Sequence, residues 1–206
     1  MRNSFYKNIG LNLVFLFLFL PSVQAAPSVG NKAPSFTGID SNGQRLNLSD
    51  FRGKTVILEW TNHDCPFVAR HYETGNMQKH QKKATSEGVI WLSIISSAPG
   101  LQGYVDGNGA NKLTKARNAN PTHVILDPSG KIGNSYSART TPHMYIIDST
   151  GILIYQGGID DNPTSYGKIE EDTANYILNA LDEIKAGKTL TKSTSQPYGC
   201  SVKYGS

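Results

Sequence analysis

Two cysteines, Cys65 and Cys200, have the greatest capacity for covalent chemistry in this 206-residue chain. Cys65 lies between an apolar stretch, 55–60, that predicts a buried strand and a stretch, 66–87, that predicts a helix. A thiol at the start of a helix faces the positive end of the helix dipole, which favours the thiolate. The thiolate is the form that attacks disulfides and peroxides. We therefore predict that Cys65 is a redox nucleophile.

The second cysteine, Cys200, lies in a segment, 196–204, that mixes turn formers with aromatic and β-branched residues. This composition predicts a segment that docks on the protein. Cys200 is expected either to resolve a mixed disulfide or sulfenic acid formed on Cys65, within or between chains, or to form a permanent disulfide with Cys65. Such a disulfide would close a long loop and stabilise the protein by about 4–5 kcal/mol. A third possibility is that Cys65 acts alone.

The first 25 residues are expected to be a secretory signal. Two basic residues, Arg2 and Lys7, precede a short apolar run, 11–20, and small residues surround a cleavage point near Ala25. The alternative is an uncleaved anchor. Cleavage leaves 181 residues and lowers the net charge from +4 to +2, because the segment holds two basic residues and no acid. We expect the mature protein to be periplasmic or secreted, with no membrane attachment, and its two cysteines to pair in an oxidising compartment.

The mature length predicts one domain, 26–187, followed by a C-terminal tail, 188–206. A net charge of +2 does not favour nucleic-acid binding, and the basic cluster 79–83 is interpreted as the solvated face of a helix. His63, Cys65 and His71 lack the spacing of a metal site, so neither a metal nor another cofactor is expected.

Hydrophobic patterning predicts an α/β domain with a mixed sheet and helices on both faces. Two long apolar strands flank the helix that follows Cys65, and such a strand–helix–strand unit makes its strands parallel. The predicted order is a hairpin at 36–48, a strand at 55–60, a helix at 66–87, a strand at 89–95, a polar insertion at 98–120 with a short helix near 112–117, a strand at 123–127, a short helix at 131–138, a hairpin at 143–148 and 152–155, and a helix at 166–185.

This order, with a cysteine after the first core strand and a Thr141–Pro142 step before the last hairpin, resembles the thioredoxin fold. The motifs GNKAPSF at 30–36, LSDFRGK at 48–54 and YIID at 145–148 resemble the redoxin branch, which includes peroxiredoxin-like alkyl hydroperoxide reductase/thiol-specific antioxidant proteins. The resemblance implies a central mixed sheet flanked by helices, with an N-terminal hairpin.

The resemblance also implies the residues that support Cys65. Pro142 would form a cis peptide bond beside the cysteine and leave the backbone of Thr141 free to pair with an extended peptide; the alternative is an ordinary trans proline. Glu59 would be a buried acid that relays a proton, or else a solvated residue at a strand edge. Apart from the resemblance, His63 lies two residues before the cysteine and would lower the thiol pKa when protonated, or else be an exposed loop histidine.

The chain also departs from its relatives around the cysteine. Val68 stands where thioredoxins have the second cysteine of Cys-x-x-Cys. Leu58 and Asn62 stand where peroxiredoxins have a proline and a hydroxyl residue, and Pro142 replaces their arginine. A redox cycle at Cys65 therefore needs Cys200 or a thiol from another molecule.

Two functions from different classes follow. The first is an exported thiol–disulfide oxidoreductase or peroxiredoxin-like antioxidant protein, whose substrates are protein thiols and disulfides or a peroxide and which is recycled by a thiol reductant that the sequence does not identify. The second is a non-catalytic binding protein of thioredoxin fold, in which Cys65–Cys200 is a structural disulfide.

Overall fold

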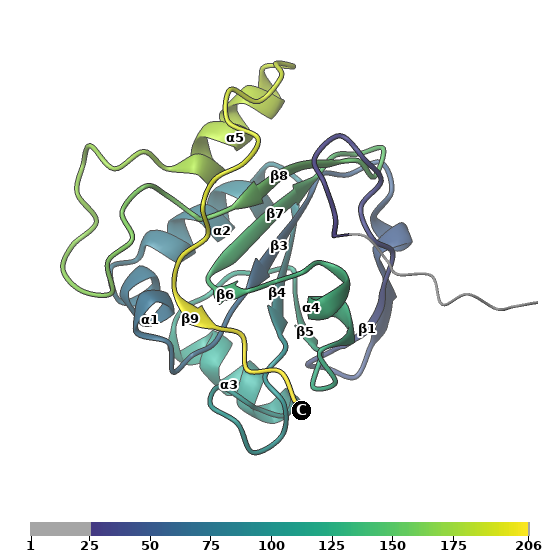
Figure 1. The fold of residues 1–206 in the computed structure, drawn as a ribbon, viewed down its shortest axis with the longest axis vertical. Helices are drawn as coiled ribbons and strands as arrows, with labels where there is room; N and C mark the ends of the chain where they lie inside the picture. The colour runs from purple at the N-terminus through teal and green to yellow at the C-terminus, as the bar shows by residue number, and fades with distance from the viewer. Residues whose placement is uncertain (1–25, 206) are drawn as a thin grey trace, which may run out of the picture.

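The structure, a computed structural model, describes residues 26–205, so the predicted signal segment 1–25 lies outside the described residues. A seven-stranded sheet forms the centre of the fold (Figure 1). Its strands, in spatial order, are β2 (Arg45–Asn47), β1 (Thr37–Asp40), β5 (His123–Leu126), β4 (Ile90–Ile95), β3 (Val56–Trp60), β7 (His143–Ile147) and β8 (Leu153–Gly157).

The sheet is mixed, as predicted. The central strands β3, β4 and β5 are parallel, whereas β1 and β2 on one side and β7 and β8 on the other run antiparallel to their neighbours. The helices are α1 (Pro66–Glu73), α2 (Asn76–Ser86), α3 (Gly107–Ala116), α4 (Lys131–Ser135) and α5 (Tyr176–Lys185), and a 3-10 turn, η1 (Leu48–Phe51), follows β2. This arrangement confirms the thioredoxin-like fold with an N-terminal hairpin.

Alternation along β3 divides the core into two layers, because successive strand residues point to opposite faces of a sheet. Leu58 and Trp60 pack on the face covered by α4, where the ring of Trp60 contacts those of Tyr136 and Tyr145. Ile57 faces the opposite layer, which is covered by α1, α2 and α5. The sheet therefore fixes the end of β3, from which the chain turns to Cys65.

The single helix predicted at 66–87 is two helices. The helix is interrupted at Thr74 and Gly75. Gly75 adopts φ +74°, a left-handed conformation that glycine accepts at little cost. The insertion helix α3 is longer than predicted and begins after Asp106, whose carboxylate accepts a hydrogen bond from the Gly109 amide at 2.7 Å.

The last helix starts ten residues later than predicted. It is capped by Asn175, whose side-chain oxygen accepts a hydrogen bond from the Leu178 amide at 3.0 Å. The preceding loop is held by the buried side chain of Arg70, which donates to the carbonyl oxygens of Asn162, Thr164, Gly167 and Lys168. The carbonyls of Gly167 and Lys168 would have been paired within the predicted helix, and the arginine pairs them in the loop instead.

The C-terminal segment lies along the domain rather than extending from it. In Figure 1 its yellow trace runs from α5 past β8 and on to a small second sheet, where β9 (Cys200–Ser201) pairs with β6 (Thr140–Thr141). The prediction that residues 196–204 dock is thus confirmed. Within residues 26–205, no helix combines the length and the apolar character needed to cross a membrane.

Candidate active site

Cys65 lies at the junction between β3 and α1, where the sequence placed it. It is the N-cap residue of α1, Pro66 occupies the first turn, and the Cys65 amide donates to the Asn62 carbonyl at 3.1 Å. The proline fits there because the first helical turn needs no amide donor at that position. The side chain of Cys65 is fully buried. The thiol therefore lies at the N-terminus of α1 and is shielded from solvent.

Two groups lie against the sulfur of Cys65. Its Sγ is 3.1 Å from the carbonyl oxygen of Thr141, and the bond between Thr141 and Pro142 is cis, as the resemblance implied. The thiol of Cys200 is in hydrogen-bonding contact with Cys65, because β9 aligns Cys200 directly opposite Thr141. Both cysteines are free thiols. Residues that are far apart in sequence thus meet at one point.

The two thiols differ in their pKa values. Burial acts to raise the pKa of Cys65, but hydrogen bonds from the Cys200 thiol, the Thr141 side chain and the Val68 backbone outweigh it, and the net pKa is lowered. Burial raises the pKa of Cys200 to about 11, and the hydrogen bond to Cys65 and the charge of Cys65 contribute. Of the two thiols, Cys65 therefore ionises more readily than Cys200.

Glu59 is a buried acid and not a solvated residue at a strand edge. Its carboxylate accepts hydrogen bonds from Tyr72 at 3.1 Å, Gln81 at 3.2 Å, Trp91 at 2.8 Å and Ser93 at 2.7 Å. Desolvation raises the pKa of Glu59 more than these four donors lower it. The side chain is thus a neutral acid over a wider pH range than a solvated glutamate.

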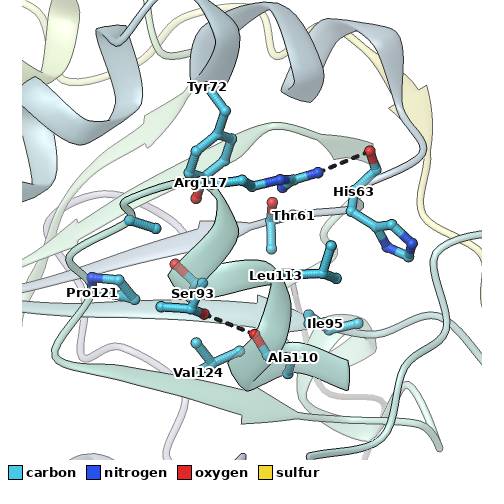
Figure 2. A pocket seen from close by; sticks show the side chains of 12 residues that line it. Thr61, His63, Tyr72, Ser93, Ile95, Ala110, Leu113, Arg117, Pro121 and Val124 are labelled. Carbon is cyan, nitrogen blue, oxygen red and sulfur yellow. Dashed lines mark hydrogen bonds between the residues drawn. The ribbon is translucent and has the colours of Figure 1, made fainter. Parts of the chain in front are cut away.

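A small cavity of about 30 Å³ lies beneath α3, beside the donors of Glu59. Figure 2 shows that the side chain of Arg117 lines one side of the cavity, between Tyr72 and His63. The guanidinium carbon lies 4.7 Å from the centre of the Tyr72 ring, and Nη2 donates to the His63 carbonyl at 3.0 Å. Ser93 also lines the cavity. This volume is sufficient for about one water molecule beside Glu59.

His63 pairs with its neighbour Asp64 and forms no hydrogen bond with Cys65 in the described part of the chain. Its Nε2 is 3.3 Å from Asp64 Oδ1, and its side chain is 24% exposed. The loop turns the ring toward Asp64 because its backbone is fixed by Arg117. These contacts do not support the predicted role of His63 in lowering the pKa of Cys65.

Neither of the side chains that could replace the hydroxyl of a peroxide site, those of Asn62 and Thr61, is hydrogen-bonded to Cys65 in the described part of the chain. Asn62 accepts from the Asp64 amide at 2.9 Å and donates to the Gln102 carbonyl at 3.3 Å. The hydroxyl of Thr61 points into the cavity of Figure 2. Among residues 26–205, no group of three or more His, Cys, Asp and Glu side chains is arranged to hold a metal ion.

Sequence reasoning missed the partners of Glu59 and a second polar cluster near Cys200. The cluster consists of Tyr198 with His71 and Asp160. Aromatic and polar residues at these positions were visible in the sequence, but nothing local indicated that they meet. Only the mixture of turn formers with aromatic and β-branched residues around Tyr198 indicated an ordered segment.

The chain was compared with known proteins. It is 25% identical over 128 residues to thiol-disulfide oxidoreductase ResA of Bacillus subtilis, which covers 62% of this chain and 65% of that protein. It is 27% identical over 128 residues to ResA of Geobacillus kaustophilus, covering 62% of this chain and 68% of that protein. The chain thus matches about two thirds of the length of these relatives.

Solved structures show the same fold. An uncharacterized conserved protein from Geobacillus kaustophilus superposes with a TM-score of 0.76 at 22% identity, covering 86% of this chain and 93% of that one. The thioredoxin domain of a thiol-disulfide oxidoreductase from Bacteroides vulgatus gives a TM-score of 0.50 at 22% identity, covering 64% and 89%. The family model described as Redoxin matches residues 28–178, and the chain belongs to the Redoxin family.

Proposed function

We propose that this protein is an exported thiol–disulfide oxidoreductase in which Cys65 is the nucleophile and Cys200 the resolving thiol. The observation that carries the proposal is the contact between two free thiols whose pKa values move in opposite directions. The curated relatives are thiol-disulfide oxidoreductases, which supports the same chemistry. Export rests on the signal predicted from residues 1–25.

In the first step, the Cys65 thiolate attacks one sulfur of a substrate disulfide. A mixed disulfide forms on Cys65, and the other substrate sulfur leaves as a thiolate that takes a proton from solvent. The lowered pKa of Cys65 increases the fraction of this sulfur that is ionised at a given pH. Thr141 and Pro142 shape the site on the substrate side, because the Thr141 carbonyl contacts the reacting sulfur.

In the second step, Cys200 loses its proton and attacks Cys65 Sγ. A Cys65–Cys200 disulfide forms, the second substrate thiolate leaves, and the substrate disulfide has gained two electrons from two protein thiols. The pKa of Cys200, about 11, falls at this stage because the mixed disulfide removes the charge of Cys65. An external thiol reductant returns the protein to the dithiol, and the same steps in reverse oxidise a dithiol substrate.

Glu59 is assigned a supporting role as a proton reservoir. Its raised pKa allows it to hold a proton at higher pH than a solvated glutamate, and two of its donors, Tyr72 and Ser93, line the cavity beneath α3. A water molecule in that cavity would connect the acid to the loop before Cys65.

Disulfides are favoured over peroxides as the substrate class. A peroxide site needs a free hydroxyl or amide beside the reactive sulfur. The Asn62 side chain is held by Asp64 and Gln102, and in the described part of the chain no hydrogen bond joins it or the Thr61 hydroxyl to Cys65. Hydrogen peroxide consumption is therefore expected to be negligible beside disulfide exchange.

The test is turnover of a peptide disulfide by the mature protein, with dithiothreitol as the electron source. Wild type is expected to accelerate reduction, Cys65→Ser to abolish it, and Cys200→Ser to accumulate a mixed disulfide on Cys65 that mass spectrometry detects. Absence of turnover in wild type, together with a loss of stability in Cys200→Ser under oxidising conditions, would instead establish the structural disulfide of a binding protein.

A further inference from the structure

Residues 193–204, here called the strap, cover the reactive thiol. Cys65 is fully buried although it lies in the connection that follows β3, and the strap supplies the thiol of Cys200 that contacts it. Figure 1 shows this yellow segment passing β8, then the start of α1, then β6. A substrate sulfur can reach Cys65 only if the strap moves aside.

The strap pairs with the backbone directly before Pro142. Ser201 and Cys200 are the antiparallel partners of Thr140 and Thr141, and the Val202 amide donates to the Arg139 carbonyl at 3.0 Å. One strand edge can accept one extended chain at a time. The strap thus fills the position in which an extended peptide would place its own cysteine against Cys65.

On one side of Cys200, Tyr198 fastens the strap through a chain of hydrogen bonds. Asn76 donates to His71 Nδ1 at 2.8 Å, so the proton of the neutral ring is on Nε2, which lies 3.0 Å from the Tyr198 hydroxyl. That hydroxyl in turn donates to Asp160 Oδ1 at 2.5 Å. Burial lowers the pKa of His71 to about 3, which keeps the ring neutral.

On the other side of Cys200, two residues fasten the end of the strap. The Ala98 amide donates to the Lys203 carbonyl at 2.8 Å. The Tyr204 hydroxyl donates to the Ala138 carbonyl at 2.8 Å, and its ring lies over Gly130. The strap is therefore held by separate polar contacts on both flanks, which can break without disturbing the sheet.

The residue before Cys200 has to be glycine. Gly199 adopts φ +126°, and a Cβ atom there would collide with the carbonyl oxygen of Thr141. Any chain that presents a cysteine to Cys65 along this edge meets the same carbonyl. The geometry therefore favours a small residue immediately before the reacting cysteine.

We propose that the strap is a tethered substitute for substrate, which closes the site by occupying the edge where an extended, cysteine-containing segment of another polypeptide would bind. The strap leaves β6 when that segment binds and returns with Cys200 to resolve the mixed disulfide. This inference rests on the proposed function for the identity of the reaction, but closure of the site by the strap is independent of turnover.

The first test measures closure alone. Reduced mature protein is treated with iodoacetamide, and labelling of Cys65 is followed by peptide mass spectrometry. Tyr198→Phe removes two hydrogen bonds but retains the ring, so the open population and the labelling rate of Cys65 should rise about tenfold. Tyr166→Phe is the matched control, because Tyr166 is 80% exposed, and should leave the rate unchanged.

The double variant Tyr198→Phe/Tyr204→Phe loosens both flanks and should label faster still. If Cys65 labels in both variants at the wild-type rate, the strap does not gate the thiol and the inference is overturned. The labelling rate does not depend on oxidoreductase activity. It therefore tests closure by the strap even if the proposed function is wrong.

The second test asks where a polypeptide docks. The Cys200→Ala variant is reacted with a peptide whose single cysteine is activated as the thionitrobenzoate mixed disulfide, and separately with methyl methanethiosulfonate, which leaves on Cys65 only an S-methyl group in place of the Cys200 thiol. We expect the Val202 amide to lose its protection from hydrogen exchange in the peptide adduct and to keep it in the small adduct. Retained protection in the peptide adduct overturns the inference; failure of either reagent to modify Cys65 contradicts the proposed nucleophile instead.

Discussion

Thr141 and Cys200 face each other across the β6–β9 ladder, and the carbonyl oxygen of Thr141 also contacts the sulfur of Cys65 at 3.1 Å. One backbone residue therefore aligns both thiols. The pairing explains why a chain without Cys-x-x-Cys still brings two sulfurs together. It also means that changes at either strand should be visible in the acidity and accessibility of Cys65.

The first prediction concerns the acidity of Cys65. Cys200→Ala removes the side-chain hydrogen bond that helps to lower the pKa of Cys65, so that pKa should rise. The thiolate then forms at higher pH, which ultraviolet thiolate absorbance measures without a probe having to enter the site. Cys200→Ser retains a hydroxyl donor and should give a smaller rise. An equal or lower pKa in Cys200→Ala would show that Cys200 does not stabilise the thiolate.

The second prediction concerns Glu59 and pH-dependent stability. The pKa of Glu59 is raised in the folded protein above its ordinary value of 4.5. The folded state then binds more protons than the unfolded state, so the free energy of unfolding falls as pH rises from 4.5 through the folded pKa. Glu59→Gln cannot ionise and should lack this part of the decline. Urea unfolding of both proteins across that range measures the difference, and parallel curves would contradict it.

The third prediction uses Val68, which occupies the second cysteine position of the related motif. The side chain is fully buried in the first turn of α1, and valine and cysteine are close in size. In the variant Val68→Cys/Cys200→Ala, mild oxidation should form a disulfide between residues 65 and 68. Thiol counting before and after oxidation detects it. Two free thiols persisting under conditions that oxidise the wild-type pair would argue against a thioredoxin-like register at this helix.

The fourth prediction concerns Gly199. In Gly199→Ala the added methyl group meets the Thr141 carbonyl oxygen, so β9 should separate from β6. Limited trypsin digestion should then cut after Lys203 much faster than in wild type. Gly187→Ala is the control, because Gly187 also has positive φ, +66°, but has open space around its Cα. Equal digestion of Gly199→Ala and wild type would mean that the strap tolerates the clash.

Local patterns predicted most of the fold because strand and helix periodicities depend on neighbouring residues. The position of Cys65 follows from one such junction, and Pro142 follows from resemblance. The break at Gly75 had a local signal, the glycine itself, which a long helical pattern concealed. The late start of α5 had none, because Arg70 holds the loop from a distant helix. The cluster of Tyr198, His71 and Asp160 could not be predicted either, because its members come from three segments that are far apart in the sequence.

The complete burial of Cys65 has a consequence for chemical damage. An ionised thiol exposed to an oxidising environment is driven to sulfinic and sulfonic acids, which thiols do not reverse. With its solvent exposure at 0%, Cys65 combines a lowered pKa with physical shelter from small oxidants. The protein should therefore retain its reactive sulfur through long exposure to peroxide while closed and lose it rapidly when opened.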